Sequence, residues 1–279
     1  MKIGAIIQAR VSSTRLPGKV LKDLPHGSGI TVLEQVIGRL KRSKKLNDII
    51  VATTVEKADN KIVNISKKKD VKYFRGNREN VLSRFYLAAQ KNNLDIIVRI
   101  TGDCPCIDSE IIDLIISKHL KIKADYTSNS LKRTFPEGLD VEVFNFSVLA
   151  KAYENAQRGY EKEHVTPYIY DNPSIFKIIQ IKAPEKFRAP SIRITLDTEE
   201  DYALLCVVFD CLYRKKKYFN TSDIINLFNK KPWLKLINKK VIQKKIFHTL
   251  EDELREAARI LDIQDLKKAR DFIKNNLSK

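Results

Sequence analysis

The sequence has little of what marks a secreted or membrane protein. It holds only four cysteines, Cys104, Cys106, Cys206 and Cys211, and their spacing matches neither a disulfide framework nor paired CxxC zinc ligands. No apolar run approaches the roughly 20 residues that a membrane span needs. The opening MKIGAIIQAR also lacks the small-residue cleavage site of a secretory signal. We therefore expect a cytoplasmic protein with reduced cysteines and no membrane partner.

Three common catalytic or phosphate-binding motifs are also missing. No GxGxxG follows the first apolar segment, and Gly18-Lys19 lacks the earlier glycine and the following Ser or Thr of a P-loop. There is no GxSxG motif, and the four histidines are scattered along the chain. These absences argue against a dinucleotide loop, a P-loop and a Ser/His/Asp nucleophile.

The composition is that of a folded protein with a basic end. Hydrophobic residues make up 43% of the 279 residues, which is enough to bury the core of a large α/β domain with an appendage. The formal net charge is +18, and residues 211–279 hold 18 Lys and Arg against 8 Asp and Glu. Nucleic-acid binding is thus one alternative, although this segment shows no helix-turn-helix and no aromatic-interleaved sheet motif. A basic tail by itself indicates solubility or non-specific attraction to polyanions.

Apolar strands and amphipathic helices alternate in the first part of the chain. The pattern predicts strands at 3–9, 48–54, 71–74 and 94–101, and helices at 31–42, 79–92 and 108–121. Strands that alternate with helices form mostly parallel sheets covered on both faces. We therefore predict an α/β fold with a mostly parallel sheet and helices on both faces.

The alternation weakens after residue 125. We interpret residues 125–192 as an excursion that carries substrate or dimer contacts, with an extended piece at 140–145, a helix at 147–157 and a strand at 175–182. A strand at 192–197 is then expected to return to the core, followed by helices at 198–213 and 221–229. Two further helical patterns, 249–261 and 266–277, indicate an appended hairpin. The domains are predicted as 1–245 and a basic helical extension at 246–279.

The first predicted strand leads directly into a basic loop. The run IIQARVSSTRLPGK places Arg10, Arg15 and Lys19 among Ser, Thr, Pro and Gly residues that break the strand and leave backbone N–H groups free. Arginine offers bidentate contacts and lysine a point charge, a mixture that suits an anion with many oxygens. A basic loop is otherwise ordinary solvated surface. Its place at the end of a strand in an α/β pattern favours a polyphosphate site instead.

Two acidic residues follow buried segments of similar sequence. Asp103 stands in RITGDCP and Asp197 in RITLDTEED. Carboxylates at the ends of strands along one edge of a sheet converge, and Mg²⁺ takes a few carboxylates together with phosphate oxygens and waters. The alternative for Asp197 is a helix N-cap, a role that Thr198 can share. Together with the basic loop, the two carboxylates predict phosphoryl or nucleotidyl transfer.

The basic loop and several later segments resemble those of a known family. The basic loop resembles the opening of the cytidylyltransferases that make CMP-activated sugar acids, such as the CMP-KDO and CMP-sialate synthetases. The segments YFRGNRENVLSRF, RITGDCPCID, EGLDVEVF, EKEHVTPYIY and RITLDTEEDYALL follow in the order typical of the spore coat polysaccharide biosynthesis protein F family. The resemblance covers roughly residues 1–245 and leaves the tail without a family role.

The resemblance implies a GT-A/Rossmann-like nucleotidyltransferase. Such an enzyme uses CTP and Mg²⁺, is usually a homodimer, and activates a sugar acid or a sugar or polyol phosphate for surface polysaccharide or glycan synthesis. It implies catalytic roles for Arg10, Lys19, Asp103 and Asp197, with Asp103 and Asp197 as the metal ligands. The nucleotide-binding residues are then expected to be Ala9, Arg10, Ser13, Arg15, Lys19 and Arg78. A glycosyltransferase of the same fold is the alternative activity, although the chain has no DxD motif after the strand at 94–101.

The middle segment supplies candidate residues for the acceptor. Carboxylates accept hydrogen bonds from sugar hydroxyls, so Glu137, Asp140, Glu163 and His164 are the predicted substrate-binding residues. The alternation of Asp140 and Glu142 with valines is also the pattern of a half-exposed strand. For Arg78, Asn80 and Arg84, the alternatives are contact with base or ribose and a solvated helix face. The sequence does not name the acceptor.

Overall fold

The computed structural model describes residues 1–242 and 249–277, which divide into two compact units, Met1–Val241 and Ile242–Lys279. The strands of the first unit are β1 (Ile3–Gln8), β2 (Asp48–Thr54), β3 (Lys72–Gly76), β4 (Ile96–Thr101), β5 (Tyr126–Ser128), β6 (Glu142–Asn145) and β7 (Ile178–Gln180). Its helices are α1 (Val32–Leu40), α2 (Asn60–Lys68), α3 (Val81–Lys91), α4 (Ser109–Ile122), α5 (Phe146–Asn155), α6 (Gly159–His164), α7 (Pro167–Tyr170), α8 (Glu199–Leu212), α9 (Thr221–Lys230) and α10 (Leu234–Ile237).

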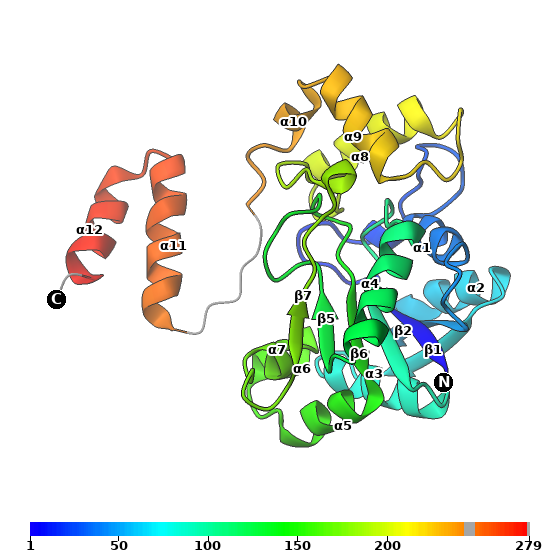
Figure 1. The fold of residues 1–279 in the computed structure, drawn as a ribbon. Helices are drawn as coiled ribbons and strands as arrows, with labels where there is room; N and C mark the ends of the chain where they lie inside the picture. Colours follow the sequence, from blue (N-terminus) through cyan, green and yellow to red (C-terminus); the bar gives the residue numbers. More distant parts are fainter. Residues whose placement is uncertain (243–248, 278–279) are drawn as a thin grey trace. The chain divides into compact units, whose positions relative to one another are not determined.

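The strands form one seven-stranded sheet in the order β3-β2-β1-β4-β6-β5-β7 (Figure 1). The first four strands of this order run parallel to one another, and β6 runs antiparallel to both β4 and β5. The middle of β1 is buried on both sides because helices cover both faces, as its unbroken apolar sequence predicts. The predicted mostly parallel α/β sheet is therefore confirmed.

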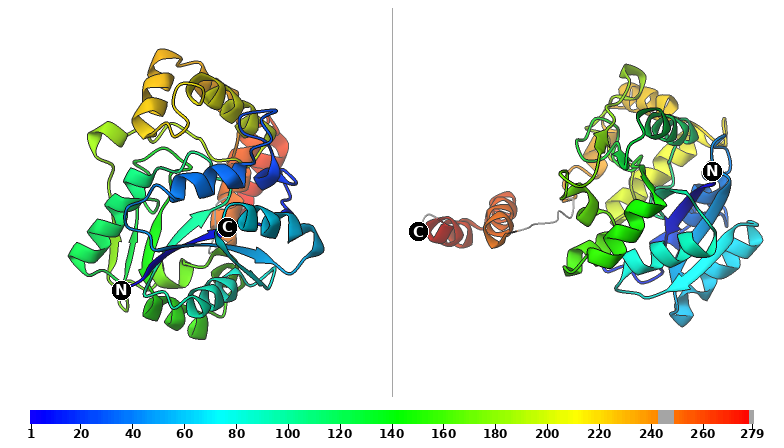
Figure 2. Two further views of the ribbon diagram at one scale, coloured as in Figure 1. Left: turned by 90° about the vertical axis from the view of Figure 1, so that its right-hand side faces the viewer. Right: turned by 60° about the horizontal axis from the view of Figure 1, so that its bottom comes forward.

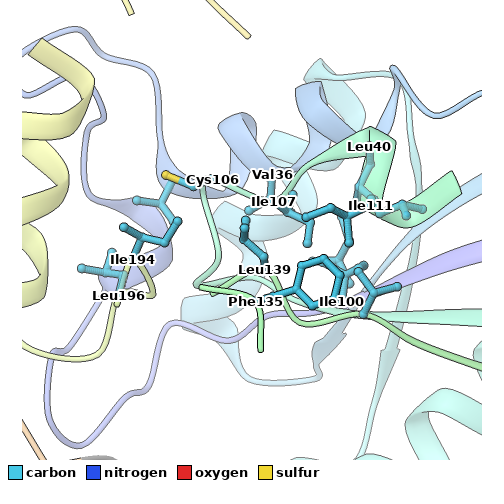
Figure 3. Close-up of a cluster of buried hydrophobic side chains, with 14 of the residues drawn as sticks. Val36, Leu40, Ile100, Cys106, Ile107, Ile111, Phe135, Leu139, Ile194 and Leu196 are labelled. Carbon is cyan, nitrogen blue, oxygen red and sulfur yellow. The ribbon is translucent and has the colours of Figure 1, made fainter. Parts of the chain in front are cut away.

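One face of the sheet is covered by α1, α4, α8 and α9. Alternate strand residues such as Ile7 and Val98 point to this side and pack against the apolar stripes of the helices. Figure 3 shows part of this core, where Ile107, just before α4, lies beside Val36 of α1. Helix α1 begins at a capping box in which Thr31 and Glu34 bond to each other's backbone N–H groups.

The opposite face is covered by α3, α5 and α7. Ile6 and Ile97 point to this side and join a second apolar cluster with Phe85, Leu149 and Ile169. Figure 2 shows the sheet lying between the two layers of helices. This arrangement leaves the loops that follow the parallel strands as the natural place for a ligand.

Two details differ from the sequence-based prediction. The strand predicted at 192–197 is wrong, because only Arg193 forms a bridge, with Glu137, and the chain then turns away. The Leu196 N–H donates to the Asp103 carbonyl at 2.9 Å instead of continuing a ladder. Helix α2 was not predicted, because only two of its apolar residues, Ile62 and Val63, are buried, and the segment is rich in lysine.

The second unit is a pair of helices. It contains α11 (Leu250–Ile263) and α12 (Lys267–Leu277), which begin and end close to the predicted bounds. Thr249 caps α11 by accepting a hydrogen bond from the Asp252 N–H. Among the residues placed in the structure, no helix has both the length and the apolar character that crossing a membrane requires.

Candidate active site

The basic loop after β1 is fastened to the fold at both ends. The Val11 N–H donates to the buried carboxylate of Asp59 at 2.7 Å, and Leu16 is buried in the core. Gly18 has a φ of 69°, a left-handed conformation that lets the chain turn into the short helix Lys19–Leu21. The loop therefore presents its cationic side chains from a fixed backbone.

Lys19 lies between the two predicted metal ligands. Its Nζ atom is 2.5 Å from Asp103 Oδ2 and 2.8 Å from Asp197 Oδ1. Arg15 also reaches Asp197, with Nη2 at 3.1 Å from Oδ1. Asp103 lies two residues after the end of β4. The Gly102 N–H donates to the Gln8 carbonyl, and this bond holds the end of β4 against the end of β1. Residues far apart in the sequence thus form one cluster of alternating charge.

The cluster shifts the pKa values of its members. Burial by itself lowers the pKa of Lys19, but the charges of Asp103 and Asp197 outweigh it, so the net shift is upward. For Asp103, burial raises the pKa, but the charge and hydrogen bond of Lys19, together with hydrogen bonds from Thr101 and the backbone, lower it by more. Both groups therefore carry their charges at neutral pH.

A network behind Asp197 fixes its position. Arg193 Nη2 lies 3.2 Å from Asp197 Oδ2 and 2.8 Å from the fully buried Asp201, whose carboxylate also accepts the Asp197 N–H. Asn238 donates to Asp201 at 2.8 Å. The N-cap of α8 is Thr198, which accepts a hydrogen bond from the Asp201 N–H. The alternative of Asp197 as the helix cap is therefore wrong, and its carboxylate faces the loop.

The two carboxylates are a donor set that fits a magnesium ion. Mg²⁺ prefers one or two carboxylates plus phosphate oxygens and water, and Asp103 and Asp197 both lie within hydrogen-bond reach of one ammonium group. Within residues 1–242 and 249–277 there is no group of three His, Cys, Asp or Glu side chains that would hold an ion alone. An ion between these two carboxylates would take its remaining oxygens from water or from a bound molecule.

A second buried cation lies close to the loop. Arg84 in α3 is 2% exposed, and its Nη1 donates to the Asn77 carbonyl at 3.0 Å. Burial, and next the charge of Arg10, lower the pKa of Arg84 to about 10. The alternative of a solvated helix face is wrong for Arg84, because its position in the stripe with Val81 and Phe85 faces the interior. The helical spacing of Arg84 with Val81 and Phe85 is a sequence signal that could have predicted its burial.

The other predicted nucleotide-binding residues lie in varied surroundings. Ala9 is buried at the end of β1 and donates its N–H to the Ala52 carbonyl, whereas Ser13 is half-buried in the loop. Arg78 is about half exposed, and its Nε atom is 3.5 Å from the exposed carboxylate of Glu79. Arg78 is therefore free to move toward a ligand at little cost.

One of the predicted acceptor-binding residues joins the cluster, and a second forms a separate ion pair. Glu137 pairs with Arg193, which also holds Asp197, and Asp140 pairs with Arg133. The pKa of Glu137 is raised, because burial and the charge of Asp140 together outweigh the lowering by Arg193 and Arg133. Glu163 and His164 lie at the end of α6. The structure thus brings Glu137 next to the site and leaves Glu163 and His164 on a separate helix.

Glu142 lies in a strand, as its alternation with valines suggests, but it is buried and not half exposed. It is buried in β6, where its Oε2 atom pairs with Arg99 Nη1 at 2.8 Å and accepts a hydrogen bond from the Thr166 hydroxyl. Arg99 also donates to the Gln8 side chain. This buried pair joins the ends of three strands beside the site.

Gly138 lies against the segment that leads to Asp197, and its substitution tests whether this close approach matters for stability. It has a φ of 100°, and a Cβ at this position would lie 2.7 Å from the backbone of Ile194 and Thr195. We expect Gly138→Ala to lower the free energy of unfolding by at least about 2 kcal/mol, because backbone strain and overlap add. Gly159→Ala is the control, since nothing lies within 4 Å there, and we expect a change of about 0.5 kcal/mol or less. Denaturant unfolding measures both; equal stabilities would contradict the close approach.

The chain matches one protein family and is similar to a solved structure. The sequence profile of the family described as Cytidylyltransferase matches residues 4–246. A solved structure of a cytidylyltransferase from Leptospira borgpetersenii has 38% identity and a TM-score of 0.78, covering 89% of this chain and 100% of that one. Helices α11 and α12 lie outside the matched residues.

Three curated relatives are similar to most of this chain. An uncharacterized protein of Methanocaldococcus jannaschii is 43% identical over 88% of this chain and 97% of its own length. The spore coat polysaccharide biosynthesis protein SpsF of Bacillus subtilis is 35% identical over 81% of this chain and 94% of its own length. A 3-deoxy-manno-octulosonate cytidylyltransferase of Fusobacterium nucleatum is 34% identical over 65% of this chain and 72% of its own length.

Proposed function

Because the chain belongs to the cytidylyltransferase family, we propose that it activates a sugar acid, or a sugar or polyol phosphate, with CTP. The product then carries CMP or CDP and serves surface polysaccharide or glycan synthesis. This proposal is supported by the relatives that are named for polysaccharide biosynthesis and for cytidylyl transfer. A homodimer and a cytoplasmic location stay predictions.

The reaction is an exchange at one phosphorus atom. An oxygen of the acceptor attacks the α-phosphorus of CTP, and the bond from that phosphorus to the bridging oxygen of the β-phosphate breaks. The electron pair leaves with pyrophosphate. Where the attacking oxygen belongs to a hydroxyl group, its proton passes to solvent water, whereas a phosphate oxygen attacks as an anion and has no proton to lose. No covalent enzyme intermediate is required, so the protein contributes position and charge.

The chain's own residues divide this work. Arg10, Arg15 and Lys19 neutralise the triphosphate from the fixed loop and stabilise the charge that develops on pyrophosphate. Glu137, which Arg193 holds beside Asp197, accepts hydrogen bonds from the acceptor. Arg193 and Asp201 keep the Asp197 carboxylate aimed at the loop.

Asp103 and Asp197 would hold the magnesium ion. When bound, the ion supplies Lewis-acid stabilisation of the charge on the phosphate oxygens. In the absence of nucleotide, the ammonium group of Lys19 neutralises the same two carboxylates. Binding of the triphosphate offers Lys19 new oxygen partners and so releases the carboxylates for the ion.

The observation that carries the proposal is the Lys19–Asp103–Asp197 cluster at the end of the basic loop. The test is release of pyrophosphate when the full chain is incubated with CTP, Mg²⁺ and a panel of ulosonic acids and sugar or polyol phosphates. We expect one class of acceptor to give pyrophosphate and a cytidylylated product in equal amounts. Thermal shifts with CTP, a UDP-sugar and a CMP-sugar form the control: stabilisation by a nucleotide sugar but not by CTP would contradict the proposal and favour a glycosyltransferase.

A further inference from the structure

Gln8 is the last residue of β1 and lies where the sheet meets the candidate active site. Its backbone carbonyl accepts the Gly102 N–H at 2.9 Å, one residue before Asp103, and the chain continues from Gln8 directly into the basic loop. Because β1 and β4 run parallel, Gln8 lies opposite Thr101 at the carboxyl edge of the sheet. This edge is where open α/β sheets bind ligands.

Two hydrogen bonds from Arg99 fix the orientation of the Gln8 carboxamide. Arg99 Nε lies 3.2 Å from Gln8 Oε1, and Arg99 Nη2 lies 2.9 Å from the same oxygen. A guanidinium group has only donors, so it faces the oxygen of the amide and turns the amide nitrogen the other way. The Nη1 group of Arg99 donates to Glu142 at 2.8 Å, which holds the guanidinium in place.

The Nε2 group of Gln8 is a donor without a partner. It makes no hydrogen bond to the residues in 1–242 and 249–277, and it is not among the fully buried side-chain atoms that lack one. The amide nitrogen is therefore accessible, whereas the amide oxygen is occupied. A donor that its neighbours already hold in one orientation binds a ligand oxygen at a small cost in conformational entropy.

The same network reaches the end of α6 through Glu142. Its Oε2 atom accepts the Thr166 hydroxyl at 3.1 Å. The residue before Thr166 is Val165, which has a φ of 73° and a ψ of −52°, and the Thr166 N–H donates to the His164 carbonyl at 2.9 Å. These features define a γ-turn, which is strained for a β-branched residue. The bond to Glu142 helps to hold this turn.

The strained turn ties the network to the acceptor side of the site. Strained backbone that buried bonds hold in place is typical of functional sites. The turn at Val165 ends the helix that carries Glu163 and His164, two of the predicted acceptor-binding residues. The network also holds Gln8 from β4 and β6, on the side of β1 away from β2. The free donor of Gln8 is therefore joined to the part of the chain that was expected to contact the acceptor.

We propose that Gln8 is a specificity-determining residue that donates a hydrogen bond from Nε2 to an anionic oxygen of the acceptor. This inference rests on the proposed function, because it requires an acceptor beside the basic loop. A carboxylate oxygen and a phosphate oxygen both accept such a bond, and the two proposed classes of acceptor carry one or the other. Arg99 and Glu142 are positioning residues, since they act by orienting Gln8.

The substitution Gln8→Glu tests this role, because it keeps the contact with Arg99 and removes the donor. The new carboxylate still accepts both bonds from Arg99, so we expect the stability of the fold to be retained. It presents an oxygen where the wild type presents an N–H group, and it repels an anionic acceptor. We expect binding of the acceptor to weaken about a hundredfold and binding of the nucleotide to stay unchanged.

Calorimetric titration of the full chain measures both affinities. An ulosonic acid and a polyol phosphate are titrated separately, with Mg²⁺ and α,β-methylene-CTP present so that no reaction occurs. Gln8→Met removes the donor without adding a charge, and we expect it to weaken acceptor binding about tenfold. Gln90→Glu is the matched control, because Gln90 is an exposed residue on α3 that bonds to the Tyr86 hydroxyl, and acceptor binding should not change.

A purely structural role of Gln8 gives a different result. Gln8→Glu would then bind the acceptor as tightly as the wild type, and this outcome would overturn the proposal. Weaker binding of α,β-methylene-CTP instead of the acceptor, or no binding of either acceptor class to the wild type, would overturn it as well. Where Gln8→Glu does not fold, as judged by circular dichroism, unchanged acceptor binding in Gln8→Met is the contradicting result.

The same measurements keep this inference apart from the proposed function. Acceptor binding that depends on Gln8, without release of pyrophosphate from CTP, would contradict the proposed function and leave the role of Gln8 in place. The class of acceptor that Gln8→Glu weakens identifies the bound oxygen as that of a carboxylate or that of a phosphate.

Discussion

Replacement of Asp103 by Asn is expected to reduce the rate of pyrophosphate release about a thousandfold. Asn has nearly the same shape, so the fold and the contact with Lys19 should survive, but the negative charge is lost from a site that already holds several cations. A charge that stabilises the reacting phosphates through a metal contributes several kcal/mol to the barrier, and each 1.36 kcal/mol changes the rate about tenfold. The loss should appear in kcat with every acceptor.

The matched control for this substitution is Asp210→Asn. Asp210 is an exposed carboxylate on α8 that has no hydrogen bond or ion pair among the described residues. It tests whether loss of one negative charge anywhere on this basic chain lowers the rate. Retention of wild-type activity in Asp103→Asn would contradict the assignment of Asp103 as a metal ligand.

Replacement of Lys19 by Met should have two effects of opposite sign. Pyrophosphate release is expected to fall by about 10² to 10³, because a cation that stabilises the leaving group is removed. Binding of Mn²⁺ in the absence of nucleotide, measured by electron paramagnetic resonance, is expected to become tighter. The reason is that Asp103 and Asp197 then lose the ammonium group that neutralises them in the free protein.

Lys22→Met is the control for the Lys19 variant. Lys22 directly follows the same short helix but lies over the Tyr202 ring, away from both carboxylates. It should leave both activity and Mn²⁺ binding unchanged. If Lys19→Met binds Mn²⁺ no better than the wild type, Lys19 and the ion do not share one position.

The sheet and its covering helices were predictable because their signal is local. The unbroken apolar run of β1 and the apolar stripe of α1 each reflect burial that follows from a strand or helix period. The short strand β5 and the helices α6 and α7 carry too few apolar residues for such a period, whereas β7 lies within the strand predicted at 175–182. Their positions depend on contacts made by distant parts of the chain.

The candidate site also combines residues that a local pattern predicts with a residue that distant contacts place. The basic loop and Asp103 follow strands that the sequence indicates clearly, so their positions could be predicted from the end of each strand. Asp197 was expected at the end of a strand, yet the segment before it makes only one bridge. It reaches the site because Gly138 permits close contact with Ile194 and because Arg193 and Asp201 hold it there. Those contacts span residues 137 to 201, and no local pattern encodes them.

A crystal structure of the full chain with CTP and Mg²⁺ is the most direct test of the central claim, that the basic loop and the two aspartates form one triphosphate–metal site. We predict the triphosphate against Arg10, Arg15 and Lys19, and the ion between the carboxylates of Asp103 and Asp197. A triphosphate bound elsewhere, with Lys19 still between the two carboxylates, would contradict this account.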